Sequence, residues 1–318
     1  MTAAGSLRTN ARWRWWELAL FAALPLCWWL LPGQSLLLNE IAITALFAVS
    51  LDLILGYAGI VSLGHAAFFG LGAYTAALVA NDVMPEPLAG LGIAIAASAL
   101  LGLASSALIL RGSDLTRLMV TLGVASLLYE LANKLDWLTG GADGMQVAMA
   151  PLAGRFEFDL AGRTALAYSL AVLGVALFVA RRIVHSPFGL SLQALRDNRL
   201  RAASIGLSVP LRLVAIYTFS AALAGAAGAL LAQTAGIASL DMFGFERSAD
   251  ILLVLVIGGT GYLYGGIFGA IAFKLLHDLV SAWTPEYWNF WVGLFLVVLV
   301  MVGRERLVRP WTWWRRAP

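Results

Sequence analysis

The sequence predicts an all-α, polytopic membrane protein with about ten transmembrane helices, within a range of eight to eleven. Hydrophobic residues make up 61% of the 318 residues, charged residues only 12%, and the mean hydropathy is +0.84. Soluble domains carry about 25% charged residues, so this composition excludes a soluble globule. Helix is the required structure, because each unpaired backbone group in lipid costs several kcal/mol.

Crossing the hydrocarbon core as a helix takes roughly 20 apolar residues. Several of the candidate segments are shorter than this, and the third and ninth begin in glycine-rich turns, which sets the range around ten. The expected spans are 17–31, 36–55, 65–80, 88–110, 118–138, 164–180, 212–234, 248–263, 265–283 and 288–303.

Basic residues orient these spans, because cytoplasmic loops are enriched in Lys and Arg. With the N-terminus inside, most basic residues fall in inner loops or the C-terminal tail, whereas the outer loop 81–87 carries acids and no base. The basic residues left near the outside are Lys134, Arg155, Arg163 and Arg247. We therefore expect both termini to be cytoplasmic, with an N-terminal segment 1–16, a transmembrane domain 17–303 and a tail 304–318.

Several function classes find no support. Cys27 is the single cysteine, so no internal disulfide forms, and the three histidines share no metal-ligand spacing, so no metal site is expected. The arginines form no continuous patch for nucleic acid. No phosphate-binding Walker loop and no hydrolase motif occurs, so we expect no enzyme activity and no cofactor in this chain. Energy for transport must come from another subunit or from a gradient.

The segment 186–210 is polar and arginine-bearing, and it interrupts an otherwise apolar chain. Drawn as one helix, it gathers small and apolar side chains on one face, with Arg199 interrupting that face. One interpretation is a cytoplasmic surface that meets a soluble partner. The other is a positively charged loop lying on lipid head groups.

Two glycine-rich turns share the spacing G-x2-G-x4-G. They are formed by Gly56, Gly59 and Gly64 and by Gly258, Gly261 and Gly266, and Gly259 lies inside the second. Broken or closely packed helices near a translocation path need such permissive residues. Chance recurrence is the alternative, because the chain contains 32 glycines.

Ionisable residues inside or beside spans need partners or a watery cavity, since one at mid-bilayer costs about 2.5–3.5 kcal/mol on insertion scales. Lys274 and Asp278 are spaced i,i+4, and we expect them to pair. His65 either lines a pathway or caps a helix break. The set is Asp52, His65, Glu130, Asp250, Lys274 and Asp278.

The stretch TGGADG, Thr139–Gly144, is expected on the outer side. Its glycine amides and Asp143 suit contact with an amino-acid ligand or a binding protein. The alternative is a plain connecting loop.

Four motifs then carry a family resemblance. RDNRLRAASIGL (Arg196–Leu207) resembles the cytoplasmic coupling loop of the permeases of branched-chain amino acid ABC importers. LGYAGIVSLGHAAFFGLGAYTAAL (Leu55–Leu78), LTGGADGM (Leu138–Met145) and VIGGTGYLYGGIFGA (Val256–Ala270) resemble three further motifs of that family in the same order. The chain looks like the longer, M-type permease. It departs from the family pattern at Arg199, Arg201 and Asp250, where an acid, an alanine and a glutamate are common.

The resemblance implies a permease subunit of an ATP-driven importer in the bacterial inner membrane, carrying branched-chain or related amino acids, urea or short amides. The implied partners are a second homologous permease, two ATPase subunits that bind the ATP, an extracytoplasmic substrate-binding protein and membrane lipids. The expected ATPase-coupling residues are Arg196, Asp197, Asn198, Arg199, Ala202, Ala203 and Gly206. The expected path or gate residues are Gly56, Gly59, Gly64, His65, Thr139, Gly140, Gly141, Asp143, Gly258, Gly259 and Gly261. The competing hypothesis is a gradient-driven carrier that uses Asp52, Glu130 and Asp250.

Overall fold

The structure, a computed structural model, describes residues 15–283 apart from 31, 110, 111, 113, 149, 153 and 160, together with five positions between 290 and 297. The long helices are α2 (Trp15–Leu30), α3 (Ser35–Asp52), α4 (Ala66–Leu78), α5 (Pro87–Ile109), α6 (Asp114–Lys134), α8 (Arg163–Val184), α11 (Val209–Ala235), α12 (Phe245–Gly258) and α13 (Gly265–Trp283). The short helices are η1 (Pro32–Gln34), the π-helical turns η2 (Leu53–Tyr57) and η3 (Val79–Val83), α7 (Asp136–Thr139), η4 (Gly141–Asp143), α9 (Pro187–Asp197), α10 (Arg199–Ser204) and η5 (Leu240–Phe243).

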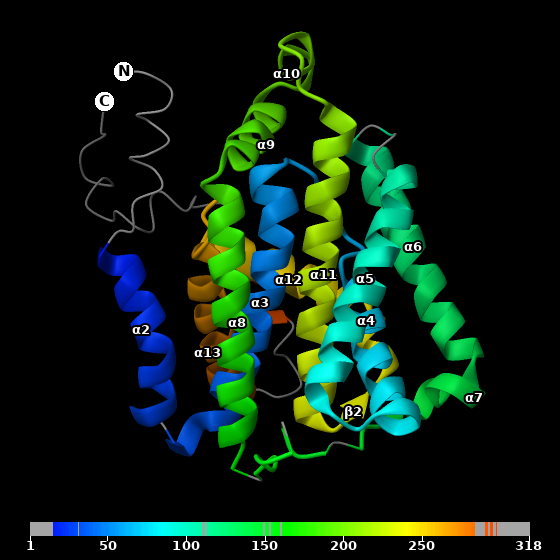
Figure 1. Ribbon diagram of the computed structural model, residues 1–318, viewed down its shortest axis with the longest axis vertical. Coiled ribbons are helices and arrows are strands. Elements are labelled where there is room, and N and C mark those ends of the chain that lie inside the picture. The colour runs from blue at the N-terminus through cyan, green and yellow to red at the C-terminus, as the bar shows by residue number, and fades with distance from the viewer. Residues whose placement is uncertain are drawn as a thin grey trace.

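Helix α11 lies at the centre of the bundle and packs against α3, α4 and α5 (Figure 1). Its middle turns are rich in alanine and glycine and almost wholly buried. A side chain at Gly72 of α4 would overlap the backbone of Gly225 on α11, so these two helices meet backbone to backbone. Small residues promote such close packing where lipid removes the hydrophobic drive between helices.

The bundle has two distinct ends (Figure 1). Helices α9 and α10 cover one, here called the α10 end. At the other, the β end, strand β1 (Met145–Gln146) pairs antiparallel with β2 (Ile237–Ala238), Met145 opposite Ala238. Short connections make successive long helices antiparallel, so α3 and α12 both run from the β end toward the α10 end.

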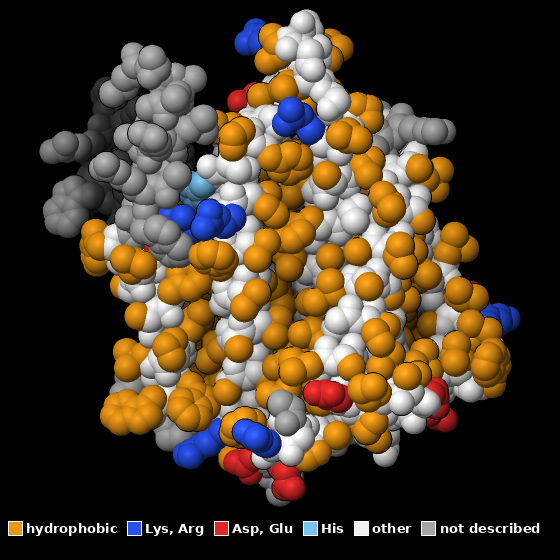
Figure 2. All heavy atoms as spheres, viewed as in Figure 1, with side chains coloured by type: hydrophobic (Ala, Val, Ile, Leu, Met, Phe, Trp, Pro, Cys, Tyr) orange, Lys and Arg blue, Asp and Glu red, His pale blue; other side chains and the backbone are white. Residues whose placement is uncertain are grey.

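The flank of the bundle is largely apolar, and charged side chains gather toward the two ends (Figure 2). By length and composition, six helices of the described residues suffice to cross a membrane: α3 with η2, α4 with η3, α5, α6, α8 and α11. Helices α2, α12 and α13 occupy three more of the expected spans, and the tenth, 288–303, lies largely outside the described residues. The chain is thus a multi-pass helical membrane protein.

Helix α12 is shorter than expected, because it ends at Gly258 and not at residue 263. Its 14 residues rise about 21 Å, less than the roughly 30 Å of a hydrocarbon core. Helix α12 alone is therefore too short to cross the hydrocarbon core.

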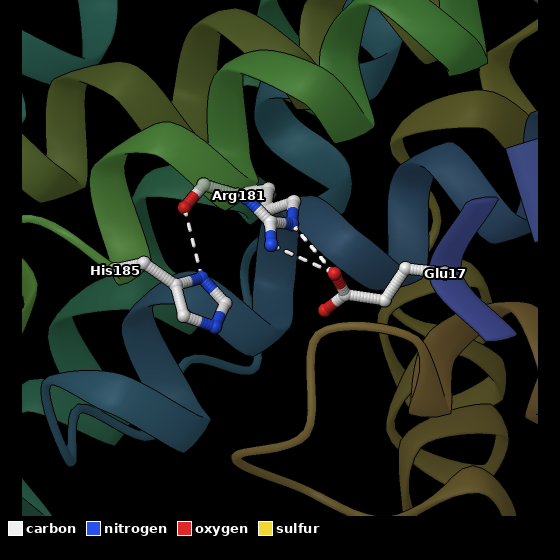
Figure 3. A network of polar contacts seen from close by, with 3 residues as sticks. All are labelled: Glu17, Arg181 and His185. Atoms are coloured by element: carbon white, nitrogen blue, oxygen red, sulfur yellow. Dashed lines mark hydrogen bonds and ion pairs between the residues drawn. The ribbon is translucent and has the colours of Figure 1, made fainter. Parts of the chain in front are cut away.

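A buried ion pair attaches α2 to α8 (Figure 3). The Arg181 guanidinium donates to Oε2 of Glu17 through Nη2 at 2.7 Å and Nε at 3.1 Å, and both side chains are about 95% buried. The Nδ1 atom of His185 lies 3.0 Å from the Arg181 carbonyl oxygen. Arg181 was expected in an exposed inner loop, so its burial within α8 corrects that expectation.

Candidate functional site: a junction of two glycine turns below the coupling helices

The two glycine turns predicted as a repeat lie against each other. The first comprises η2 and residues 58–65, which lead into α4, and the second, residues 259–264, joins α12 to α13. Oδ1 of Asp52 accepts the Gly261 N–H at 2.7 Å, and the Tyr57 hydroxyl accepts the Leu263 N–H at 3.1 Å. We call this contact the glycine-turn junction.

Glycine is required where the turns touch. A side chain at Gly56 would overlap both the Asp52 carboxylate and the backbone of Gly261. Gly261 itself has φ +76°, a left-handed conformation that other residues adopt only with strain. The junction therefore explains why glycine occupies both positions.

Side chains satisfy the irregular backbone of the turns. The Ser248 hydroxyl accepts the Ala66 N–H at 2.9 Å, and the Thr121 hydroxyl accepts the Leu63 N–H at 3.3 Å. Where water is excluded, non-helical backbone persists only where protein groups pair with it. The patterns in the sequence singled out neither Ser248 nor Thr121, because a lone hydroxyl in an apolar helix carries no local signal.

Arg196 connects the junction to the α10 end. Its Nη1 donates a hydrogen bond to the Gly56 carbonyl oxygen, and its aliphatic stem lies where a side chain at Gly59 would stand. Its Nε lies 3.6 Å from Oδ1 of Asp197. One residue of the expected coupling set thus contacts two residues of the expected path set.

The segment expected to couple, residues 186–210, forms two helices and not the single helix as which it was drawn. Ser186 caps α9 with Pro187 in its first turn, and α9 ends at Asp197. Asn198 then adopts an extended backbone, φ −160°, and its Oδ1 accepts the Arg201 N–H at 2.9 Å, which caps α10. The break lets α10 leave the direction of α9 (Figure 1).

The break divides the expected coupling residues. Asp197, Asn198, Ala203 and Gly206 are exposed at the α10 end, whereas Ala202 is 2% exposed and supports α10 from beneath. Arg199 lies 3.7 Å from Asp114 at the start of α6, and Arg117 shares that carboxylate at 2.7 Å. Within residues 186–210 the most exposed large apolar side chains are Leu200, 85% exposed, and Ile205, 71%, which the sequence analysis did not single out.

His65 is fully buried on the side of the junction that faces the β end. Its Nε2 is 3.0 Å from the Ser50 hydroxyl and 3.5 Å from the Ser220 hydroxyl, and its ring stacks on Phe47. The side chain is fully buried and makes no capping bond to α4. His65 occupies the N-cap position of α4, and its side chain ties α3, α4 and α11 together.

The remaining expected path residues lie apart from the junction. Gly64 packs on the backbone of α6 at Thr121, and Gly258 packs α12 on α13 at Gly265. Thr139 and its glycine neighbours lie at the β end, where the Thr139 hydroxyl donates to the Ala132 carbonyl at 2.6 Å. Gly140 and Gly141 continue this turn toward β1, and Asp143 is exposed.

The ion pairs on α13 differ from the expected one. Lys274 pairs with Glu40 of α3 at 2.7 Å, so the expected Lys274–Asp278 pair is wrong, and Asp278 instead lies 3.8 Å from Nδ1 of His277. Glu130 faces outward near Lys134 at 4.0 Å. Asp52 is already engaged by the Gly261 N–H. Among the described residues, no cluster of three or more His, Cys, Asp or Glu side chains is placed to hold a metal.

Comparisons with known proteins agree with this architecture. The family model "Branched-chain amino acid transport system / permease component" matches residues 35–302. The high-affinity branched-chain amino acid transport system permease protein LivM is 32% identical in Escherichia coli (strain K12) and 31% in Salmonella typhimurium (strain LT2), covering 84% of this chain and 68% of each relative.

A third relative is named for a different transported solute. The autoinducer 2 import system permease protein LsrC of Enterobacter sp. (strain 638) is 30% identical, over 74% of this chain and 69% of its own length. No solved structure matches the chain. The extent of the family match and the likeness to LivM show that this chain belongs to the permease-component family of branched-chain amino acid transport systems.

Proposed function

We propose that this chain is the M-type permease subunit of an ATP-driven importer in the bacterial inner membrane, and that it carries branched-chain or closely related amino acids. ATP is bound and hydrolysed by two separate ATPase subunits. A second permease completes the transmembrane path, and an extracytoplasmic binding protein delivers the solute at the β end. The likeness to LivM, stronger and longer than that to LsrC, favours amino acids over other cargo.

The observation that carries the coupling role is the shape and chemistry of the α10 end. Leu200 and Ile205 project from a short helix that stands beyond the rest of the bundle (Figure 1). Arg201 and Asp197 are exposed beside them. Exposed apolar anchors with a polar rim are typical of a protein–protein interface, so the α10 end supplies the contact for the ATPase.

Arg196 connects the docking surface of the α10 end to the glycine-turn junction. A displacement of α9 moves the Arg196 guanidinium, which is bonded to Gly56 in one turn and packed near Gly261 in the other. Both turns end helices that line the centre of the bundle. Movement at the docking surface is thereby coupled to α3 and α12 without any nucleotide site in this chain.

Reconstituted uptake tests the proposal. Proteoliposomes containing the two permeases and the ATPases, supplied with the leucine-loaded binding protein, are expected to accumulate labelled leucine only with ATP. Uptake driven by a proton or sodium gradient, without ATPase, would establish the competing carrier, which the family relationship does not favour.

A second experiment tests the docking surface. Leu200→Asp with Ile205→Asp places charge on the two anchors, and the ATPase is expected to be lost from the purified complex. The control is Leu36→Asp, at an exposed leucine near the β end. Undiminished ATPase recovery with the double variant would show that the ATPase docks elsewhere.

A further inference from the structure

A cavity at the β end lies outside the glycine-turn junction. Its volume is about 760 Å³, and residues of α3, α4, α6, α11, α12, α13 and η5 line it. This volume falls within the range of roughly 300–1,000 Å³ typical of small-molecule sites. Because α3 and α12 begin at the β end, Glu40 and Glu246, near their starts, mark the opening.

The inner wall of the cavity is apolar and closed. Phe47, Phe69, Ile251 and Phe273 line it, and each is at most 5% exposed. The rings of Phe47 and Phe69 are 4.6 Å apart, and His65 stacks against the other side of Phe47. The cavity therefore ends at an aromatic wall on the side of His65.

Charges of both signs line the rest of the cavity. Lys274 and Glu40 neutralise each other at 2.7 Å on one wall. Asp250 and Arg247, one turn apart on α12, also line the cavity, and within the described residues neither makes a side-chain hydrogen bond or ion pair. Asp250 is partly buried, so its carboxylate faces the cavity with little water to solvate it.

We propose that this cavity is an outer binding station for a zwitterionic α-amino acid with an apolar side chain, an inference that rests on the proposed function. Asp250 receives the ammonium group, Arg247 the carboxylate, and the side chain lies against Phe47 and Phe69. Opposite charges one turn apart favour a solute that carries both charges and disfavour neutral solutes such as urea.

The first test compares uptake by variant complexes. Asp250→Asn and Arg247→Gln each remove one half of the charge pattern, and each is expected to lower leucine uptake at limiting loaded binding protein by about tenfold or more. Asp278→Asn and Arg155→Gln change exposed charges that do not line the cavity, and their uptake is expected to equal that of the wild type. Equal recovery of the ATPases with all four variants verifies folding.

The second test probes binding directly. Thr44→Cys, on a Cys27→Ser background, puts the only thiol in the cavity wall, where a membrane-impermeant thiol reagent added outside is expected to react. Leucine is expected to slow this reaction, and urea at the same concentration is not. Equal slowing by both solutes, or slowing by neither, would overturn the inference.

The outcomes separate the two proposals. ATP-driven leucine uptake by the wild type together with normal uptake by Asp250→Asn and Arg247→Gln would refute the cavity and leave the importer standing. Failure of the wild type to take up leucine with ATP would refute both, because the cavity's ligand is inferred from the importer's cargo.

Discussion

Replacing Gly56 by alanine is the sharpest perturbation of the glycine-turn junction. The new methyl group would overlap Oδ1 of Asp52 and the backbone of Gly261, and neither group can move away without breaking the 2.7 Å hydrogen bond from the Gly261 N–H to Oδ1. Overpacking of this kind costs about 1–3 kcal/mol. We therefore expect the apparent melting temperature of the detergent-solubilised complex to fall by roughly 2–10 °C, and ATP-driven uptake to fall with it.

Gly92→Ala is the matched control. Gly92 lies within α5, and nothing stands within 4 Å of the position that its side chain would take. Alanine there is expected to raise stability by about 0.4–1 kcal/mol, because it restricts the unfolded chain and suits a helix. The two substitutions add the same atoms and should change the melting temperature in opposite directions. Equal melting temperatures for the two variants would refute the contact between the turns.

Three further substitutions test other contacts. Asp52→Ala leaves the Gly261 N–H without its acceptor and should lower the free energy of unfolding by about 1–3 kcal/mol. Asp52→Asn keeps an oxygen acceptor and should cost less. If thermal denaturation gave the reverse order, the hydrogen bond between Asp52 and Gly261 would be contradicted. Glu17→Gln removes one charge of the buried pair with Arg181 and should destabilise the protein by about 3–5 kcal/mol. The control Glu157→Gln, at an exposed position, should cost at most about 0.5 kcal/mol. Indistinguishable unfolding curves for the two variants would show that the Glu17–Arg181 pair does not hold α2 to α8. Arg196→Ala should lower ATP-driven uptake several-fold while the ATPase still copurifies. The control Arg182→Ala, at an exposed arginine of α8, should leave uptake unchanged. Normal uptake by Arg196→Ala would show that Arg196 does not transmit the movement of α9.

The sequence was most informative where a pattern is local. Apolar runs located helices at nine of the ten expected spans, and the repeated glycine spacing identified two turns that do lie against each other. It was less informative about helix ends. The end of α12 at Gly258 could not be read from the apolar residues beyond it, because the end depends on the neighbouring turn and on Asp52.

Partners distant in sequence were the main failure. Lys274 has an acid at i+4, yet Glu40, 234 residues away, reaches it more closely. Asn198 appears helical when the segment is drawn as one helix, and only its capping bond to Arg201 shows the break. Exposure of Leu200 follows from that break, which is why the apolar anchors of the α10 end were missed.

Site-specific photocrosslinking tests the central claim most directly. A photoreactive residue in place of Leu200, 85% exposed at the α10 end, is expected to crosslink to the ATPase subunit in membranes that hold the whole complex. The same residue in place of Val83, 73% exposed toward the β end, is expected to give no ATPase adduct. An ATPase adduct at Val83 and none at Leu200 would reverse the orientation and contradict the account.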